Sequence, residues 1–185
     1  MLESNKIILV TGGSASGKSS FSERLLNNEK NILYIATAIV NDEETKRRVE
    51  HHKERRDERY RTHEGFEDLD KVVEKSDEDA ILLDCISLFI TNQMFKKNRD
   101  YDFISLDEVD DIKNDIEDEL KDFINKCREK NKMLVMVTNE VGCGIVPEFK
   151  VNRIFRSLIG STNQLVASLC DEVYLVSCGL PIKLK

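Results

Sequence analysis

The feature that most constrains the fold of this chain is a short apolar run that stops at a glycine-rich turn. Residues 7–11 read IILVT, and residues 12–19 follow as GGSASGKS. An apolar run that stops at two glycines predicts a buried strand of a parallel sheet. The turn fits the pattern G-x-x-x-x-G-K-[ST], whose backbone N–H groups surround phosphates when a strand precedes it and a helix follows. This segment therefore predicts a phosphate-binding loop on an α/β sheet.

The rest of the chain repeats the alternation of strand and helix. Further apolar runs predict four strands and one short edge strand, at residues 31–36, 80–84, 133–138, 172–177 and 182–184. Between the runs, helices are predicted at residues 19–26, 42–61, 105–130 and 151–169. Strands that are apolar throughout and alternate with helices indicate a mostly parallel sheet with helices on both faces. For 185 residues we expect a single domain over residues 1–185 with this α/β architecture.

Composition and charge argue against several classes of protein. The net charge of −7 is unlike that of a general nucleic-acid binder. No apolar run approaches the ~20 residues that a membrane-spanning helix needs, and no basic flank of a signal peptide precedes the first apolar run. The five cysteines lack the spacing of metal ligands and favour reduced thiols. We therefore expect a cytoplasmic protein that binds no nucleic acid and does not insert into a membrane.

The residues that carry chemistry are expected where the strands end. Ligands of open parallel sheets bind at the carboxyl ends of the strands, so the site should lie just after Val10, Ala36, Leu83 and Val137. In the loop after the first strand, Lys18 would reach the β- and γ-phosphates and the Ser19 hydroxyl would ligate Mg²⁺. Asp84, at the end of the run 80–84, takes the position of the carboxylate that holds Mg²⁺ or its water shell. The other loop residues would contact the phosphates: Gly12, Gly13, Ser14, Ala15, Ser16 and Gly17.

A basic segment stands out in this acidic chain. Residues 46–61 contain eight Lys or Arg and four acidic residues, and they include the adjacent His51 and His52. On a helix, His52 and Arg56 would share one face, and an imidazole beside guanidinium groups can bind or attack phosphate. On spacing alone, a solvated charged helix with two surface histidines remains the favoured interpretation.

Together these segments resemble one family. The matching stretches are VTGGSASGKSSFSE, YIATA, DEETKRRVEHHKERR with YRTHE, ILLDCISLFITN, VTNEVGCGIVPE, and RIFRSLIGSTNQ with DEVYLVSCGLP. They occur in the family's order and cover nearly the whole chain. The chain is similar to the bifunctional adenosylcobinamide kinases/adenosylcobinamide-phosphate guanylyltransferases of cobalamin assembly, which implies a fold of the P-loop NTPase type.

The resemblance implies two reactions. ATP or GTP first phosphorylates the hydroxyl on the aminopropanol arm of adenosylcobinamide. GTP then loses pyrophosphate, a histidine carries GMP, and GMP passes to the new phosphate to give adenosylcobinamide-GDP. The resemblance also implies a homotrimer.

The resemblance further assigns roles to individual residues. The family's guanylylated histidine directly precedes the Lys or Arg of an H-[KR]-x-x-R motif, which makes it His52 here. Glu64 would accept hydrogen bonds from guanine, with a structural ion pair as the alternative. Asn139 and Glu140 have either substrate-side or structural roles. The remaining nucleotide contacts implied are Ala36, Thr37, Ala38, Lys53, Glu54, Arg55 and Arg56.

Two other classes of function stay open at this point. A P-loop kinase of another small alcohol would use Lys18 and Asp84 but would have no need of His52. A regulatory or assembly module would bind nucleotide without turnover. Labelling of the chain by α-labelled GTP would separate the bifunctional enzyme from both.

Overall fold

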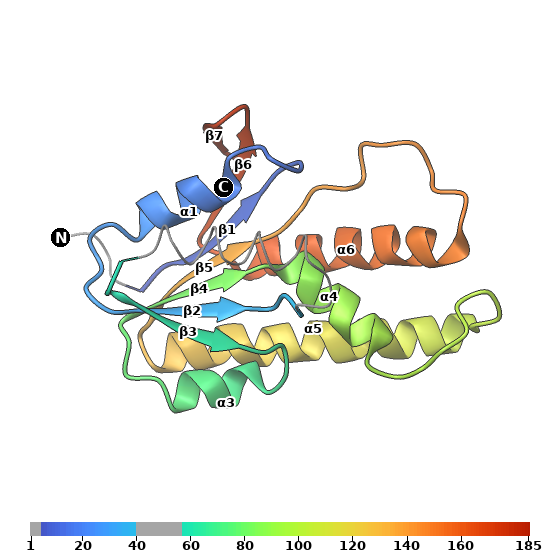
Figure 1. Cartoon of the computed structure of the whole chain (residues 1–185), viewed down its shortest axis with the longest axis horizontal. Helices are drawn as coiled ribbons and strands as arrows, with labels where there is room; N and C mark the ends of the chain where they lie inside the picture. The colour runs from blue at the N-terminus through green and yellow to red at the C-terminus, as the bar shows by residue number, and fades with distance from the viewer. Residues whose placement is uncertain (1–4, 40–56) are drawn as a thin grey trace.

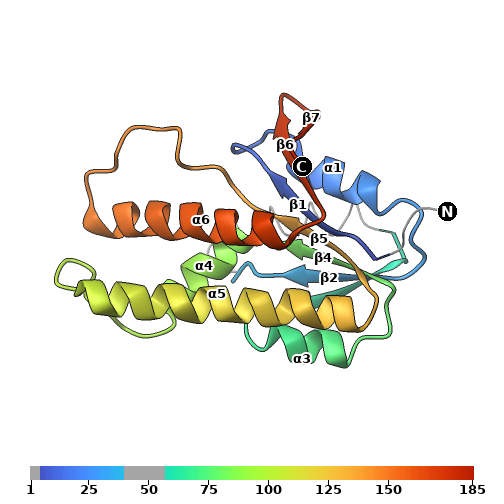
Figure 2. The same cartoon turned by 180° about the vertical axis from the view of Figure 1, so that it is seen from behind.

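The computed structural model describes residues 5–39 and 57–185, which form a seven-stranded sheet with helices on both faces (Figures 1 and 2). The strands are β1 (Ile7–Thr11), β2 (Ile32–Ala36), β3 (Tyr60–Glu64), β4 (Ala80–Asp84), β5 (Met133–Val137), β6 (Glu172–Ser177) and β7 (Leu180–Lys183). The helices are α1 (Lys18–Leu25), α3 (Leu69–Glu74), α4 (Ile86–Phe95), α5 (Leu106–Glu129) and α6 (Lys150–Leu169). The predicted α/β class is confirmed.

The strand order is β3-β2-β4-β5-β1-β6-β7. All neighbouring strands are parallel except β6 and β7, which form an antiparallel pair. The first strand of the chain therefore lies between two strands from its last third: Val10 is in register with Val137 of β5 and with Tyr174 of β6. The parallel order brings the carboxyl ends of β1, β2, β4 and β5 to one edge of the sheet (Figure 1).

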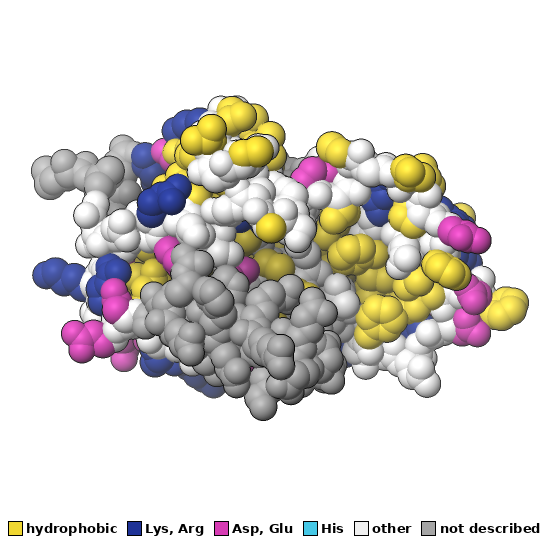
Figure 3. Space-filling model, turned by 45° about the horizontal axis from the view of Figure 1, so that its top comes forward, with side chains coloured by type: hydrophobic (Ala, Val, Ile, Leu, Met, Phe, Trp, Pro, Cys, Tyr) yellow, Lys and Arg dark blue, Asp and Glu magenta, His cyan; other side chains and the backbone are white. Residues whose placement is uncertain are grey.

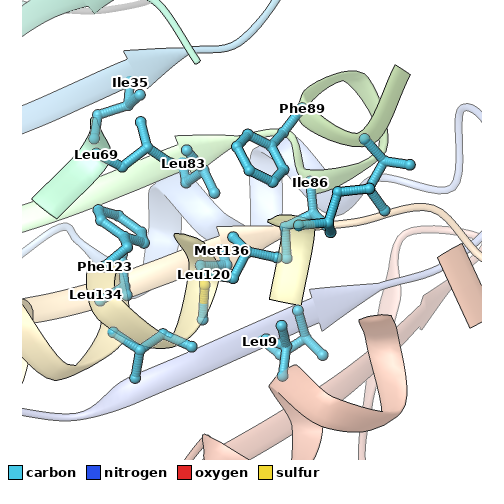
Figure 4. Close-up of a cluster of buried hydrophobic side chains, with 14 of the residues drawn as sticks. Leu9, Ile35, Leu69, Leu83, Ile86, Phe89, Leu120, Phe123, Leu134 and Met136 are labelled. Carbon is cyan, nitrogen blue, oxygen red and sulfur yellow. The ribbon is translucent and has the colours of Figure 1, made fainter. Parts of the chain in front are cut away.

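Alternate residues of each strand pack on opposite faces of the sheet. Ile7 and Leu9 belong to the core on the face covered by α5 and α6, which lie side by side in Figure 2. Figure 4 shows this core, in which the side chains of the strands meet those of α4 and α5. Ile8 and Val10 pack on the other face, together with Phe21 of α1. The strands β1, β2, β4 and β5 are apolar almost throughout because both of their faces are buried.

The helix predicted at residues 105–130 is confirmed, and its start has a clear local cause. The Ser105 hydroxyl accepts a hydrogen bond from the backbone N–H of Glu108, and the Glu108 carboxylate accepts one from the backbone N–H of Ser105. This capping box satisfies two backbone donors that the first turn would leave unpaired, so α5 begins at Leu106. Within residues 5–39 and 57–185, no helix has the length and apolar character that crossing a bilayer requires.

Three elements differ from the sequence prediction. The helix predicted at 42–61 is wrong at its end, because Tyr60–Glu64 forms the edge strand β3; its residues 42–56 lie outside the described part of the chain. The prediction also missed α3 and α4. The six residues of α3 are too few for a periodic pattern. α4 contains no charged residue and half of its residues are buried, so no charged face marks it as a helix.

Candidate active site

A cavity of about 580 Å³ opens at the carboxyl edge of the sheet. The loop after β1, the ends of the neighbouring strands, and the helices α4 and α6 all contribute to its wall. The lining residues are Ser14, Ala15, Ser16, Gly17, Lys18, Ser19, Ser20, Tyr34, Ala36, Ala38, Thr62, Asp84, Cys85, Ser87, Leu88, Thr91, Val137, Asn139 and Phe155. The cavity thus brings together the ends of the strands at which the sequence analysis expected chemistry.

Lys18 is the most deeply placed charged side chain of the phosphate-binding loop. It is only 8% exposed, and its ammonium group donates a 2.6 Å hydrogen bond to the carbonyl of Gly13. Burial lowers the pKa of Lys18, whereas the neighbouring Cys85 and Asp84 raise it. The loop ends at Gly17, whose φ of 99° suits glycine and which caps α1 without a side-chain hydrogen bond. The first N–H groups of α1 then supply the positive end of a helix beside Lys18.

The turn between β6 and β7 supports the phosphate-binding loop from behind. The backbone N–H of Gly179 donates a 2.8 Å hydrogen bond to the carbonyl of Ser16. A Cβ atom on Gly12 would lie 2.3 Å from the backbone oxygen of Val176, and one on Gly17 would lie 3.0 Å from Cα of Gly179. Both glycines are therefore needed because the C-terminal hairpin approaches the loop closely. The sequence analysis did not predict this contact, since no local pattern joins segments so far apart.

Asp84 faces the cavity at the end of β4 and has a defined partner. The hydroxyl of Tyr34, on the adjacent strand β2, donates a 3.0 Å hydrogen bond to Oδ2 of Asp84. Tyr34 is buried and also lines the cavity, together with Ser19. Tyr34 was not among the predicted site residues. Its signal in the sequence was its position in an otherwise apolar strand, two residues before the strand ends.

The segment at the end of β2, residues 36–38, lines the cavity and also attaches β2 to the neighbouring α4. Ala36 and Ala38 line the cavity, whereas Thr37 is buried. The Thr37 hydroxyl accepts a hydrogen bond from the backbone N–H of Cys85 and donates one to the carbonyl of Cys85, both at 2.8 Å. The carbonyl of Thr37 accepts a hydrogen bond from the side chain of Asn92. Thr37 thus fixes the end of β2 to the start of α4.

Glu64 ends β3, the strand farthest from the phosphate-binding loop on that side of the sheet. It is in register with Ala36, and it shares a face of β3 with Thr62, which lines the cavity. The other residues predicted in the basic segment lie outside the described residues, namely His51, His52, Lys53, Glu54, Arg55 and Arg56.

The turn after β5 connects three parts of the site. The backbone N–H of Asn139 donates to Oγ of Ser87 at 2.9 Å, and its carbonyl accepts from the side chain of Asn163 at 3.2 Å. The backbone N–H of Glu140 donates to the carbonyl of Gly12 at 3.1 Å. The turn is thereby attached to α4, α6 and the phosphate-binding loop. Asn139 lines the cavity, whereas the carboxylate of Glu140 accepts a hydrogen bond from Gly142 within the same turn.

The wall formed by α4 and α6 was not predicted. Leu88, Thr91 and Phe155 line the cavity from these two helices. Their spacing in the sequence is that of ordinary helix residues, and only the packing of α4 against α6 brings them together. Figure 3 shows hydrophobic side chains gathered in the right half of the face that it views.

Comparison with known proteins finds relatives over the whole length of the chain. A family profile described as "Cobinamide kinase / cobinamide phosphate guanyltransferase" matches residues 8–184. The "Bifunctional adenosylcobalamin biosynthesis protein CobU" of Salmonella typhimurium (strain LT2) is 40% identical over 186 residues, which cover 97% of this chain and 99% of that protein. The protein of the same name from Escherichia coli (strain K12) is 39% identical with the same coverage. Among solved structures, the KaiC-like protein PH0186 of Pyrococcus horikoshii OT3 has a TM-score of 0.49 at 10% identity, covering 92% of this chain and 70% of that one.

Proposed function

The chain belongs to the cobinamide kinase / cobinamide phosphate guanyltransferase family, and from this membership we propose that it catalyses both reactions named there. It phosphorylates adenosylcobinamide and then transfers GMP from GTP to the product. The observation that carries the proposal is the match over 97% of the chain. It is supported by the cavity, which Lys18, Ser19 and Asp84 all line.

In the kinase step, the acceptor hydroxyl oxygen forms a bond to the γ-phosphorus of ATP or GTP. The bond from that phosphorus to the β–γ bridging oxygen breaks, the nucleoside diphosphate leaves, and the hydroxyl proton passes to solvent. Lys18 and the backbone N–H groups of the loop stabilise the charge on the phosphates in this step. The burial of Lys18 strengthens its interaction with them, because the surroundings screen its charge less than water does.

In the guanylyl step, a ring nitrogen of His52 forms a bond to the α-phosphorus of GTP, and pyrophosphate leaves. A phosphate oxygen of adenosylcobinamide phosphate then attacks the same phosphorus, and the P–N bond breaks. The support for His52 is the motif H-[KR]-x-x-R, in which Lys53 and Arg56 supply the positive charge that phosphates require. Glu54 and Arg55 complete this nucleotide-binding segment.

Mg²⁺ fits the residues at the phosphate end of the cavity. The Ser19 hydroxyl and the Asp84 carboxylate line the same cavity and would hold the ion. Mg²⁺ commonly binds through one or two protein oxygens plus phosphates and water, and these two side chains offer oxygens of that kind. When bound, the ion neutralises charge on the phosphate oxygens.

The base of the nucleotide is assigned to the side of the cavity formed by β2 and β3. Ala36, Ala38 and Thr62 line that side, and Glu64 follows Thr62 on the same face of β3. A carboxylate there would accept hydrogen bonds from N1–H and N2–H of guanine. Adenine offers no such pair of donors, so Glu64 favours GTP over ATP.

The cytoplasm is the proposed site of action. All five cysteines are free thiols, which matches a reducing compartment. The net charge of −7 supports small-molecule rather than nucleic-acid substrates.

The decisive experiment concerns the covalent intermediate. The chain is incubated with α-labelled GTP and Mg²⁺ and denatured, and the label is mapped to a peptide. We expect label on His52 through a bond that is labile to acid and stable to alkali. His52→Asn should lose labelling and guanylyl transfer but keep kinase activity, while the matched variant His51→Asn should still be labelled.

Two outcomes would contradict this assignment. Label on His51 would move the nucleophile by one residue. Full guanylyl transfer by His52→Asn would exclude the covalent step and leave direct displacement by the acceptor phosphate. A wild-type chain that is never labelled but phosphorylates an alcohol would be the simple kinase that the sequence left open.

A further inference from the structure

The cavity extends beyond the end that would bind the phosphates of the nucleotide. The residues that line it there are uncharged. Among the described residues that line it, the charged ones are Lys18 and Asp84, and both belong to the phosphate end. One remaining part is the side formed by β2 and β3. The other is the wall of Leu88, Thr91, Asn139 and Phe155, here called the α4–α6 wall. Figure 1 shows that α4 and the first turns of α6, the helices that carry Leu88, Thr91 and Phe155, lie beyond the tips of the strands.

The α4–α6 wall is apolar and fixed in position. Phe155 and Leu88 are half-buried and pack against the cores on the two different faces of the sheet. The hydroxyl of Thr91 already donates a 3.0 Å hydrogen bond to the carbonyl of Ser87. Rigid apolar side chains of this kind bind an apolar ligand without much loss of conformational freedom.

Asn139 adds one polar group to this wall. Both of its backbone groups are engaged, by Ser87 and by Asn163, so its position is set by two helices. Its side-chain amide makes no hydrogen bond with any described residue. A primary amide can donate and accept at once, which matches a ligand that carries an amide or a hydroxyl.

We propose that the α4–α6 wall is the acceptor subsite of the enzyme. It binds the aminopropanol arm and the adjacent edge of the corrin ring, with Phe155 and Leu88 against the apolar part and Asn139 hydrogen-bonded to the amide of the arm. The inference rests on the proposed function. In the proposed function, the phosphates of the nucleotide bind to Lys18 and the loop, and its base binds to the side of the cavity formed by β2 and β3. The uncharged α4–α6 wall suits a neutral alcohol and amide, and it would bind a further phosphate poorly.

The test separates binding of the acceptor from binding of the nucleotide. Phe155→Ala and Asn139→Ala are compared with Ile154→Ala, a neighbour on α6 that packs against the same core but does not line the cavity. For each protein, the KM for adenosylcobinamide (called cobinamide below) is measured in the kinase reaction, and the Kd for GTP is measured by direct titration. Thermal unfolding confirms that each variant is folded.

We expect Phe155→Ala and Asn139→Ala to raise the KM for cobinamide by at least about tenfold, as for loss of a good contact in a binding pocket. The Kd for GTP should change by less than about twofold, which is under 0.5 kcal/mol. Ile154→Ala should leave both constants near the wild-type values. If Phe155→Ala does not fold, Phe155→Leu keeps the packing but loses the ring, and it should still raise the KM.

Three results would overturn the proposal. A KM for cobinamide that stays at the wild-type value in Phe155→Ala, or in Phe155→Leu if that variant is needed, would exclude the wall as the acceptor subsite. An equal weakening of GTP binding would assign the wall to the base of the nucleotide. Failure of the wild-type enzyme to phosphorylate cobinamide would contradict the proposed function itself, and the inference would fall with it.

Discussion

Lys18 is a side chain on which both proposed reactions depend. The residue is only 8% exposed, and Asp84 lies near enough to raise its pKa against the lowering effect of burial. Because both reactions develop charge on the same triphosphate, we expect Lys18→Ala to lower the rates of both by ~10²–10³. Steady-state kinetics of the kinase and guanylyl steps measures this. Lys30→Ala, which removes an exposed lysine beyond α1, is the control, and either rate remaining near wild type in Lys18→Ala would argue against a shared site.

Gly12 offers a second test at the scale of one residue. Its φ is 153°, and a Cβ atom there would meet the backbone oxygen of Val176, which cannot move aside as a side chain can. Gly12→Ala should therefore destabilise the fold by about 1–3 kcal/mol, as overpacking does. Gly13→Ala is the matched control, since a Cβ atom at Gly13 has nothing within 4 Å. Thermal unfolding of the two variants decides it: equal stabilities would mean that the contact with β6 is not tight in solution.

At the scale of elements, the β6–β7 hairpin is attached to β1 through Glu172. Its carboxylate accepts hydrogen bonds from Lys6 at 2.9 Å and from the hydroxyl of Tyr174 at 2.7 Å, and Lys183 lies 3.1 Å away. These three groups lower the pKa of Glu172 to about 2. Folding therefore favours the ionised form, and the resulting stability is present above the ordinary pKa of 4.5 and is lost as the pH falls towards 2.

Glu172→Gln should accordingly lower the free energy of unfolding by about 1–3 kcal/mol at pH 7. The difference from wild type should shrink between pH 4.5 and 2, where the carboxylate of the unfolded chain is protonated. Urea unfolding of both proteins at pH 7 and in this lower range is the measurement. A difference that is the same at every pH would show that the charge of Glu172 is not what stabilises the hairpin.

The elements that the sequence predicted well are those whose surroundings follow from the chain itself. The strands β1, β2, β4 and β5 are buried on both faces, and α5 has one apolar and one charged face. β3 is different, because it is an edge strand with exposed Arg61 and Thr62, and its charges look like the continuation of a polar helix. For β3 and α4, the fold supplies information that the local pattern lacks.

At the scale of the whole molecule, self-association remains a prediction from the family resemblance. The C-terminal hairpin exposes Leu180, Ile182 and Leu184 at 69%, 53% and 61%, which supports a contact with another chain. We expect a homotrimer, so light scattering during size-exclusion chromatography should give three times the chain mass of 21.3 kDa. A mass of one chain at micromolar concentration would contradict this prediction.

The residues of the site also fall into two groups: those that a local sequence motif predicts, and those that only the fold brings to the cavity. The loop residues 12–19 and Asp84 could be predicted because each motif follows directly from a strand end. Tyr34, the Gly179 contact and Phe155 could not, because they reach the cavity only through the strand order and the packing of α6. The role of His52 in the basic segment was inferred from the family resemblance, and it stays a prediction.

The place of β1 between β5 and β6 also has a consequence for the order in which the fold can form. β1 and its glycine loop are synthesised before both of the strands that flank them: β5 begins at residue 133, and β6 follows about 40 residues later. The turn at Gly179, whose N–H donates a hydrogen bond to the carbonyl of Ser16 in the phosphate-binding loop, is added later still. We therefore expect nucleotide affinity to appear late in folding, after the C-terminal hairpin has docked against the loop.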